Sequence, residues 1–227
     1  MSGDVRSGPE RPRKERDVTI KAVVFDLGGV FLDWNPRNLF AKLFDDRRDL
    51  DFFLTEVCNP AWNIQQDGGR RFDEAIAEVS HRHPRYAVMA SLFFERWPEM
   101  IAGLFEGTVL AARALKLRRM PLYLLSNCSA ETFPLVKERY DFPALFDGCV
   151  ISGEIRLLKP DPAIYHHLLD RFGLRAADCL FIDDVLQNVE AARSLGFAGH
   201  HFQGAGGLWD ELVARNCLEP GDRPAGV

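Results

Sequence analysis

The sequence predicts an α/β fold, in which a Rossmann-like parallel sheet carries a helical cap inserted after the first strand. Three short runs rich in β-formers predict the sheet: residues 22–25, 122–125 and 179–182. Each run is apolar throughout and is followed by turn-forming residues, as is typical of a strand buried on both faces. Strand and helix patterns alternate from Pro121 onward, which indicates parallel strands joined by right-handed crossovers.

The cap is predicted from a change of periodicity after the first strand. Apolar residues recur at helical spacing, for example at Leu39, Phe40 and Leu43. No strand pattern interrupts this region. Polar composition at both chain ends indicates segments without a packed core. We therefore expect a disordered leader at residues 1–18 and a flexible tail at 218–227. Between them, a core in two parts (19–35 and 105–217) should flank a helical cap (36–104).

Composition narrows the class of protein. A chain of 227 residues with 47% hydrophobic content suits one α/β domain with an insertion. The net charge of −5 argues against nucleic acid or an anionic membrane as a partner, and no stretch approaches the roughly 20 apolar residues of a membrane span. Five scattered cysteines without a close pair predict reduced thiols and a cytoplasmic location. We expect a monomer or a homodimer.

Polar residues follow each predicted strand. Their positions are the strand ends and one intervening loop: Asp26, Ser126 with Asn127, Lys159, and Asp183 with Asp184. The carboxyl ends of parallel strands line one crevice, so these groups should converge. A carboxylate, a hydroxyl, an ammonium and an acidic pair around one point predict metal-assisted phosphoryl transfer.

Four segments resemble the motifs of the haloacid-dehalogenase (HAD) superfamily of hydrolases. They are Phe25-Asp26-Leu27-Gly28-Gly29-Val30, Leu125-Ser126-Asn127, Lys159-Pro160 and Phe181-Ile182-Asp183-Asp184. Their order and spacing also match, over residues 21–202. The first motif, followed by Asp33-Trp34-Asn35-Pro36, is similar to the branch with a helical cap. That branch includes sugar-phosphate phosphatases and the phosphatase domain of soluble epoxide hydrolases.

The resemblance implies a phosphatase that acts on a small phosphorylated metabolite, such as a sugar phosphate. Asp26 would be the nucleophile and would form an aspartyl-phosphate. Lys159 would balance the carboxylates and stabilise charge on the transferred group. Ser126 and Asn127 would donate hydrogen bonds to the phosphoryl oxygens.

Mg²⁺ suits this site because it prefers oxygen ligands. The expected ligands are Asp26, Asp184, Asp183 and the carbonyl oxygen of Gly28. The resemblance favours Asp184 over Asp183 as the direct ligand, and the choice between them stays open.

One position departs from the pattern of many phosphatases in the superfamily. They carry an acid two residues after the nucleophile, where this chain has Gly28. General acid catalysis typically contributes about 10²–10⁴-fold in rate. Either the cap or Asp33 supplies a substitute acid, or the leaving group needs little help, or the protein is a weak phosphatase.

Residues 59–69 form the most polar and loop-like stretch of the cap. Within it, Trp62, Gln66 and Asp67 are the candidates for substrate selection.

Two other functions compete with the phosphatase. A 2-haloacid dehalogenase would use Asp26 without a metal, but the acidic pair Asp183-Asp184 has no use in attack at carbon. Dehalogenases of the superfamily also carry an aromatic residue where Gly28 stands. The alternative from another class is a non-catalytic binding module on the same fold, which the missing acid at Gly28 would explain.

Overall fold

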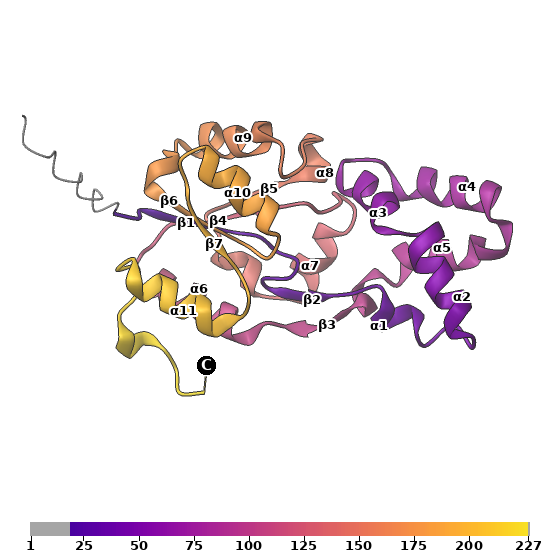
Figure 1. The fold of residues 1–227 in the computed structure, drawn as a ribbon, viewed down its shortest axis with the longest axis horizontal. Helices are drawn as coiled ribbons and strands as arrows, with labels where there is room; N and C mark the ends of the chain where they lie inside the picture. The colour runs from indigo at the N-terminus through magenta and orange to yellow at the C-terminus, as the bar shows by residue number, and fades with distance from the viewer. Residues whose placement is uncertain (1–18, 227) are drawn as a thin grey trace, which may run out of the picture.

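The computed structural model describes residues 19–226, so the predicted leader at 1–18 lies outside the described residues. Its centre is a five-stranded parallel sheet (Figure 1). In spatial order the strands are β5 (Gly148–Ile151), β4 (Leu122–Ser126), β1 (Ala22–Phe25), β6 (Cys179–Asp183) and β7 (Ala198–His201). The predicted α/β fold with a parallel sheet is confirmed.

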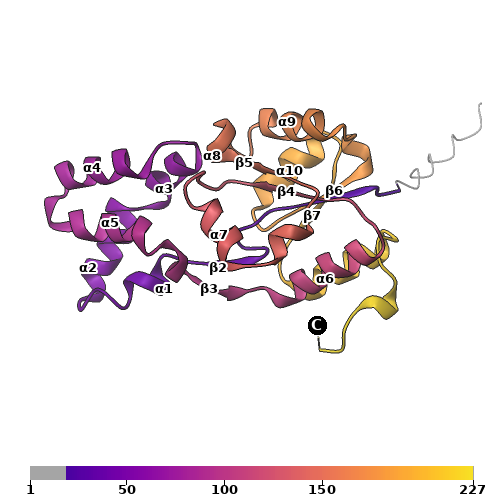
Figure 2. The same ribbon diagram turned by 180° about the vertical axis from the view of Figure 1, so that it is seen from behind.

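Helices cover both faces of the sheet (Figures 1 and 2). One face carries α9 (Pro162–Phe172) and α10 (Leu186–Ser194), and the other carries α6 (Glu106–Leu117), α7 (Phe133–Arg139) and α11 (Ala205–Ala214). Successive strand residues point to opposite faces, so Val23 and Phe25 pack in one hydrophobic cluster and Val24 in the other. Strand β1 is therefore fully buried, and Asp26 is the first residue after it.

The cap lies beside the carboxyl ends of the strands and is mainly helical (Figure 1). Its helices are α1 (Arg37–Phe40), α2 (Arg47–Phe52), a π-helical turn (Phe53–Val57), α3 (Pro60–Asp67), α4 (Phe72–Arg82) and α5 (Ala87–Glu95). Short 3₁₀ turns follow at Pro84–Tyr86 and Trp97–Met100. Buried aromatic side chains, among them Phe40, Phe53 and Phe93, form its interior.

The expectation that no strand interrupts residues 36–104 is wrong at the end of this range. Strand β3 (Ile101–Leu104) pairs antiparallel with β2 (Leu32–Trp34). A four-residue strand that contains Gly103 has a weak local pattern, and its partner lies far away in the sequence. The two chain segments that connect core and cap thus form a second, two-stranded sheet.

The loop expected at residues 59–69 is also mostly helix. The Asn59 side chain accepts a hydrogen bond from the N–H of Trp62 at 2.8 Å, and Pro60 occupies the first turn of α3. The tail differs from expectation as well, because Leu218 is buried and Arg118 pairs with Glu219 and Asp222 at 3.1 and 2.7 Å. Within residues 19–226, no helix is both long enough and apolar enough to cross a membrane.

Candidate active site

Asp26 leaves the central strand with one carboxylate oxygen bound and the other open. Its N–H donates to the carbonyl of Ile182 at 2.9 Å, which fixes the backbone between β1 and β6. Oδ1 accepts from the N–H of Leu27 at 2.7 Å and pairs with Lys159 Nζ at 2.8 Å. Among the described residues no donor reaches Oδ2. This oxygen is therefore available to attack an electrophile or to bind a cation.

Lys159 is held between two buried carboxylates. Its Nζ lies 2.8 Å from Asp26 Oδ1 and 2.7 Å from Asp183 Oδ2, and its side chain is only 1% exposed. The Asn127 side chain clamps the backbone of Lys159, donating to its carbonyl at 3.0 Å and accepting from its N–H at 2.8 Å. Asn127, expected to bind phosphate, thus uses its side chain to position Lys159.

The two neighbouring acids Asp183 and Asp184 have different environments. Both oxygens of Asp183 are occupied, because Val185 N–H, Asn188 Nδ2 and Lys159 Nζ donate to them at 2.7–3.1 Å. Asp184 is exposed, and among the described residues its carboxylate accepts only from its own backbone N–H. Asp183 is therefore tied into the protein, whereas Asp184 can still take an external ligand.

Burial sets the protonation of this cluster. Desolvation raises the pKa of Asp26 to about 7, with Lys159 opposing the shift and Asp183 adding to it. Burial would lower the pKa of Lys159, but the charges of Asp26 and Asp183 raise it above its usual value. Burial and the neighbouring Asp183 also raise the pKa of Asp184. The ammonium alone leaves a surplus of negative charge, which favours a bound cation.

The residues fit a hard divalent cation. Carboxylate oxygens of Asp26, Asp183 and Asp184 all lie within 4.8 Å of one another. The neighbouring carbonyl of Gly28 accepts no hydrogen bond from the described backbone. Oxygen donors of this kind, with room for water, are what Mg²⁺ prefers.

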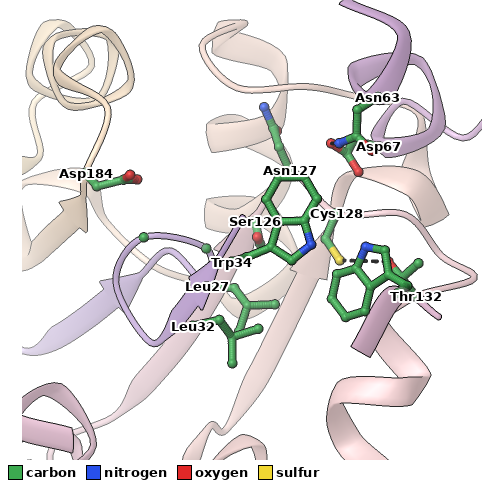
Figure 3. A pocket seen from close by; sticks show the side chains of 13 residues that line it. Leu27, Leu32, Trp34, Asn63, Asp67, Ser126, Asn127, Cys128, Thr132 and Asp184 are labelled. Carbon is green, nitrogen blue, oxygen red and sulfur yellow. Dashed lines mark hydrogen bonds between the residues drawn. The ribbon is translucent and has the colours of Figure 1, made fainter. Parts of the chain in front are cut away.

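A pocket of about 230 Å³ opens beside these groups (Figure 3). Figure 3 shows Asp184 at one side of it and Asp67 at the other, with Ser126 between them. Apolar side chains form much of the remaining wall: Leu27, Leu32, Trp34 and Trp97. Ser126 is buried at the end of β4, and no described residue hydrogen-bonds its hydroxyl. This serine is therefore placed to donate to a ligand in the pocket.

Of the three cap residues expected to select substrate, only Asp67 reaches this pocket. Trp62 and Gln66 are buried in the cap, where the indole of Trp62 packs against Phe93 and the Gln66 amide donates to the Trp62 carbonyl. Their expected contact with substrate is therefore wrong for this arrangement. Asn63, which the sequence reasoning missed, lines the pocket beside Asp67 and donates to it at 2.9 Å.

A family model for haloacid dehalogenase-like hydrolases matches residues 20–196. The chain belongs to this family. The motif resemblance is thereby confirmed, and the protein is a HAD-like hydrolase, an enzyme rather than a binding module.

Relatives of this hydrolase include phosphatases. The sesquiterpene phosphatase astK of Aspergillus oryzae is 28% identical over 88% of this chain and 95% of its own length. A phosphoglycolate phosphatase of Photobacterium profundum is 24% identical, covering 77% of this chain and 80% of its own. A HAD family enzyme of Bacteroides thetaiotaomicron (bt-2542), crystallised as a magnesium complex, shares the fold with a TM-score of 0.66 at 22% identity, over 86% of this chain and 98% of that one. The relatives support a phosphatase-like function for this hydrolase.

Proposed function

We propose that this hydrolase is a Mg²⁺-dependent phosphatase that cleaves a small phosphomonoester through an aspartyl-phosphate on Asp26. The observation that carries the proposal is the Asp26 carboxylate: Lys159 holds its Oδ1, no described residue donates to its Oδ2, and the three residues that directly follow Asp26 line the pocket. Attack of Oδ2 on phosphorus needs this fixed orientation. The acidic pair argues against the dehalogenase alternative, because displacement at carbon gains nothing from Asp184.

The other side chains have defined roles in this proposal. Asp26, Asp184 and the Gly28 carbonyl would hold Mg²⁺, which neutralises charge on the phosphoryl oxygens when bound. Asp183 keeps Lys159 in place, and the Lys159 ammonium stabilises charge on the transferred group. The Ser126 hydroxyl donates to a phosphoryl oxygen.

We also propose that the substrate has one anionic group and an apolar body. A second cavity of about 550 Å³ shares Trp34, Asn63 and Asp67 with the first pocket, and Leu54, Ile64 and Phe93 line it. The lining residues of both cavities include a single cationic side chain, Arg37, which pairs with Asp51 at 2.7 Å. A second anionic group, as in phosphoglycolate, would find no unpaired cationic side chain among these lining residues. The sesquiterpene phosphatase relative supports a hydrocarbon body over the sugar expected from the sequence.

Phosphate release should be measured with p-nitrophenyl phosphate, a long-chain branched alkyl monophosphate, a hexose phosphate and phosphoglycolate. Activity should require Mg²⁺, vanish in Asp26→Asn, and persist in the control Asp45→Asn, an exposed cap residue. Undiminished turnover in Asp26→Asn would show that the nucleophile is wrong.

A substitution in the cap tests whether the substrate has an apolar body. Ile64 is 37% exposed in the second cavity, so Ile64→Gln should fold normally but raise KM for the alkyl phosphate, by about tenfold for partial loss of an apolar contact. Val88→Gln, at a more exposed cap position outside both cavities, is the matched control. A preference for the hexose phosphate, unaffected by Ile64→Gln, would instead favour the sugar.

A further inference from the structure

Gly28 and Asp33, the two core positions considered for a proton donor, cannot protonate a leaving group in the pocket. Gly28 has no side chain, and Asp33 is exposed. Asp33 lies in β2 between Leu32 and Trp34, which both line the pocket, so the alternation of the strand directs its carboxylate to the other side. This excludes Asp33 as the substitute acid.

Asp67 is the one cap carboxylate among the residues that line the pocket, and it lies opposite Asp184 (Figure 3). It ends α3, where Asn63 precedes it by one helical turn and donates to its Oδ2 at 2.9 Å. The buried Ser152 hydroxyl donates to the Asp67 carbonyl, and Ser152 also accepts from the N–H of Cys128 at 2.9 Å. Hydrogen bonds from both cap and core therefore fix Asp67 at the pocket.

We propose that Asp67 is the general acid and base of this enzyme, replacing from the cap the carboxyl that is absent at Gly28. The inference rests on the proposed phosphatase function and adds the residue that handles the proton. An in-line displacement puts the leaving oxygen on the side of phosphorus away from Asp26. That side faces the cap, where Asp67 lies.

The proposed reaction has two chemical steps, and Asp67 transfers a proton in each. Asp26 Oδ2 bonds to phosphorus while the bond from phosphorus to the alcohol oxygen breaks. That oxygen keeps the electron pair and takes the proton of Asp67. Water then attacks the phosphorus of the aspartyl-phosphate and gives a proton to the Asp67 carboxylate. The bond from phosphorus to Asp26 breaks, inorganic phosphate leaves, and Asp67 is protonated again.

The electrostatics of Asp67 suit this double role. Burial raises its pKa to about 7, the N–H of Ser129 opposes the shift, and the charge of Asp26 adds to it. A carboxyl group with a pKa near neutrality can both give and accept a proton at working pH.

The test is the dependence of turnover on the leaving group in Asp67→Asn, with Asp45→Asn as the control. Alkyl phosphate turnover should fall by about 10²–10⁴-fold. Release of p-nitrophenolate in the first turnover should change little, because p-nitrophenolate leaves without a proton, whereas hydrolysis of the aspartyl-phosphate, which needs Asp67 as base, should slow with both substrates. Equal loss of the first-turnover rate on both substrates would make Asp67 a positioning residue, and no loss on the alkyl phosphate would remove it from the chemistry. Either result would overturn the proposal.

A second variant tests the same role by rescue. A Cβ on Gly28 would meet no atom within 4 Å, and Gly28 is not among the glycines with positive φ, so a side chain fits there. Adding Gly28→Asp to Asp67→Asn should restore much of the alkyl phosphate turnover that Asp67→Asn loses. If the double variant folds and binds Mg²⁺ but its alkyl phosphate turnover is not restored, a carboxyl at position 28 cannot replace that of Asp67, which contradicts the proposal. An inactive wild-type enzyme on p-nitrophenyl phosphate would instead count against the proposed function itself.

Discussion

A Cβ atom on Gly29 would lie 2.0 Å from Oδ2 of Asp184. No side chain can occupy that space while Asp184 keeps its position. Gly29 also has a φ of +68°, in the left-handed region that favours glycine. The turn after Asp26 and the exposed acid of the cluster are therefore packed directly against each other.

Gly29→Ala should consequently weaken Mg²⁺ binding without removing any carboxylate, because the methyl group displaces Asp184. Isothermal titration calorimetry with Mg²⁺ measures this effect. Gly103→Ala, where a Cβ meets no atom within 4 Å, should bind Mg²⁺ as the wild type does. Unchanged affinity in a folded Gly29→Ala protein would argue that Asp184 is not a metal ligand.

Lys159→Met should abolish phosphatase activity and destabilise the protein by about 3–5 kcal/mol near neutral pH, since it leaves Asp26 and Asp183 buried without their cation. Urea denaturation measures the free energy of unfolding. The surface pair Lys21–Asp178, with a lysine side chain 63% exposed, gives the control: Lys21→Met should cost about 0–1 kcal/mol. Similar decreases in the free energy of unfolding for both variants would show that the buried ion pairs of Lys159 stabilise the protein no more than the surface pair does.

Asp67→Asn should stabilise the metal-free protein, and more so as the pH rises. The pKa of Asp67 is about 7 in the folded state, against 3.8 for an ordinary aspartate. Between these values the unfolded chain has already lost the proton that the folded protein keeps, so this group reduces stability as pH increases. Asparagine has no such titration. Thermal denaturation with chelator at several pH values should show the gain growing from about pH 4 to about pH 7, and a constant gain would contradict the shift.

We expect the cap to close over bound phosphate and exclude water from it. Hydrogen bonds already link cap and core, among them those from Ser152 to the Asp67 carbonyl and from the N–H of Phe72 to Glu131 at 2.8 Å. Hydrogen exchange in residues 62–69 should slow when fluoroberyllate and Mg²⁺ are added. Glu131→Ala should speed exchange at Phe72 without ligand. Identical exchange with and without fluoroberyllate would indicate a cap that does not move.

Much of the core of the site could be predicted from the sequence because its residues follow apolar strands. A parallel sheet gathers the carboxyl ends of its strands, so Asp26, Ser126 and Asp183 converge whatever the loops do. The partners of each group could not be predicted this way. That Asn127 holds the backbone of Lys159 depends on the path of a loop 32 residues later in the chain.

Which cap residues line the pocket depends on whether residues 59–69 form a helix or a loop. Asn59 and Pro60 are typical of the start of a helix, yet the polar composition of residues 59–69 suggested a loop. In a helix, residues four apart share a face. Asn63 and Asp67 therefore line the pocket together, whereas Trp62 and Gln66 face the interior of the cap. Strand β3 was missed because its pairing with β2 is not local.

The antiparallel pairing of β2 with β3 brings the beginning and the end of the cap together, since Trp34 is the register partner of Ile101. A tight turn could join these two strands and close the chain without the intervening helices. We therefore expect that the insertion can be exchanged for another cap while the sheet and its acidic cluster stay intact. Such a graft would carry Asp67 with it, so transplanting the cap would transfer the proposed proton donor together with the apolar lining of the second cavity.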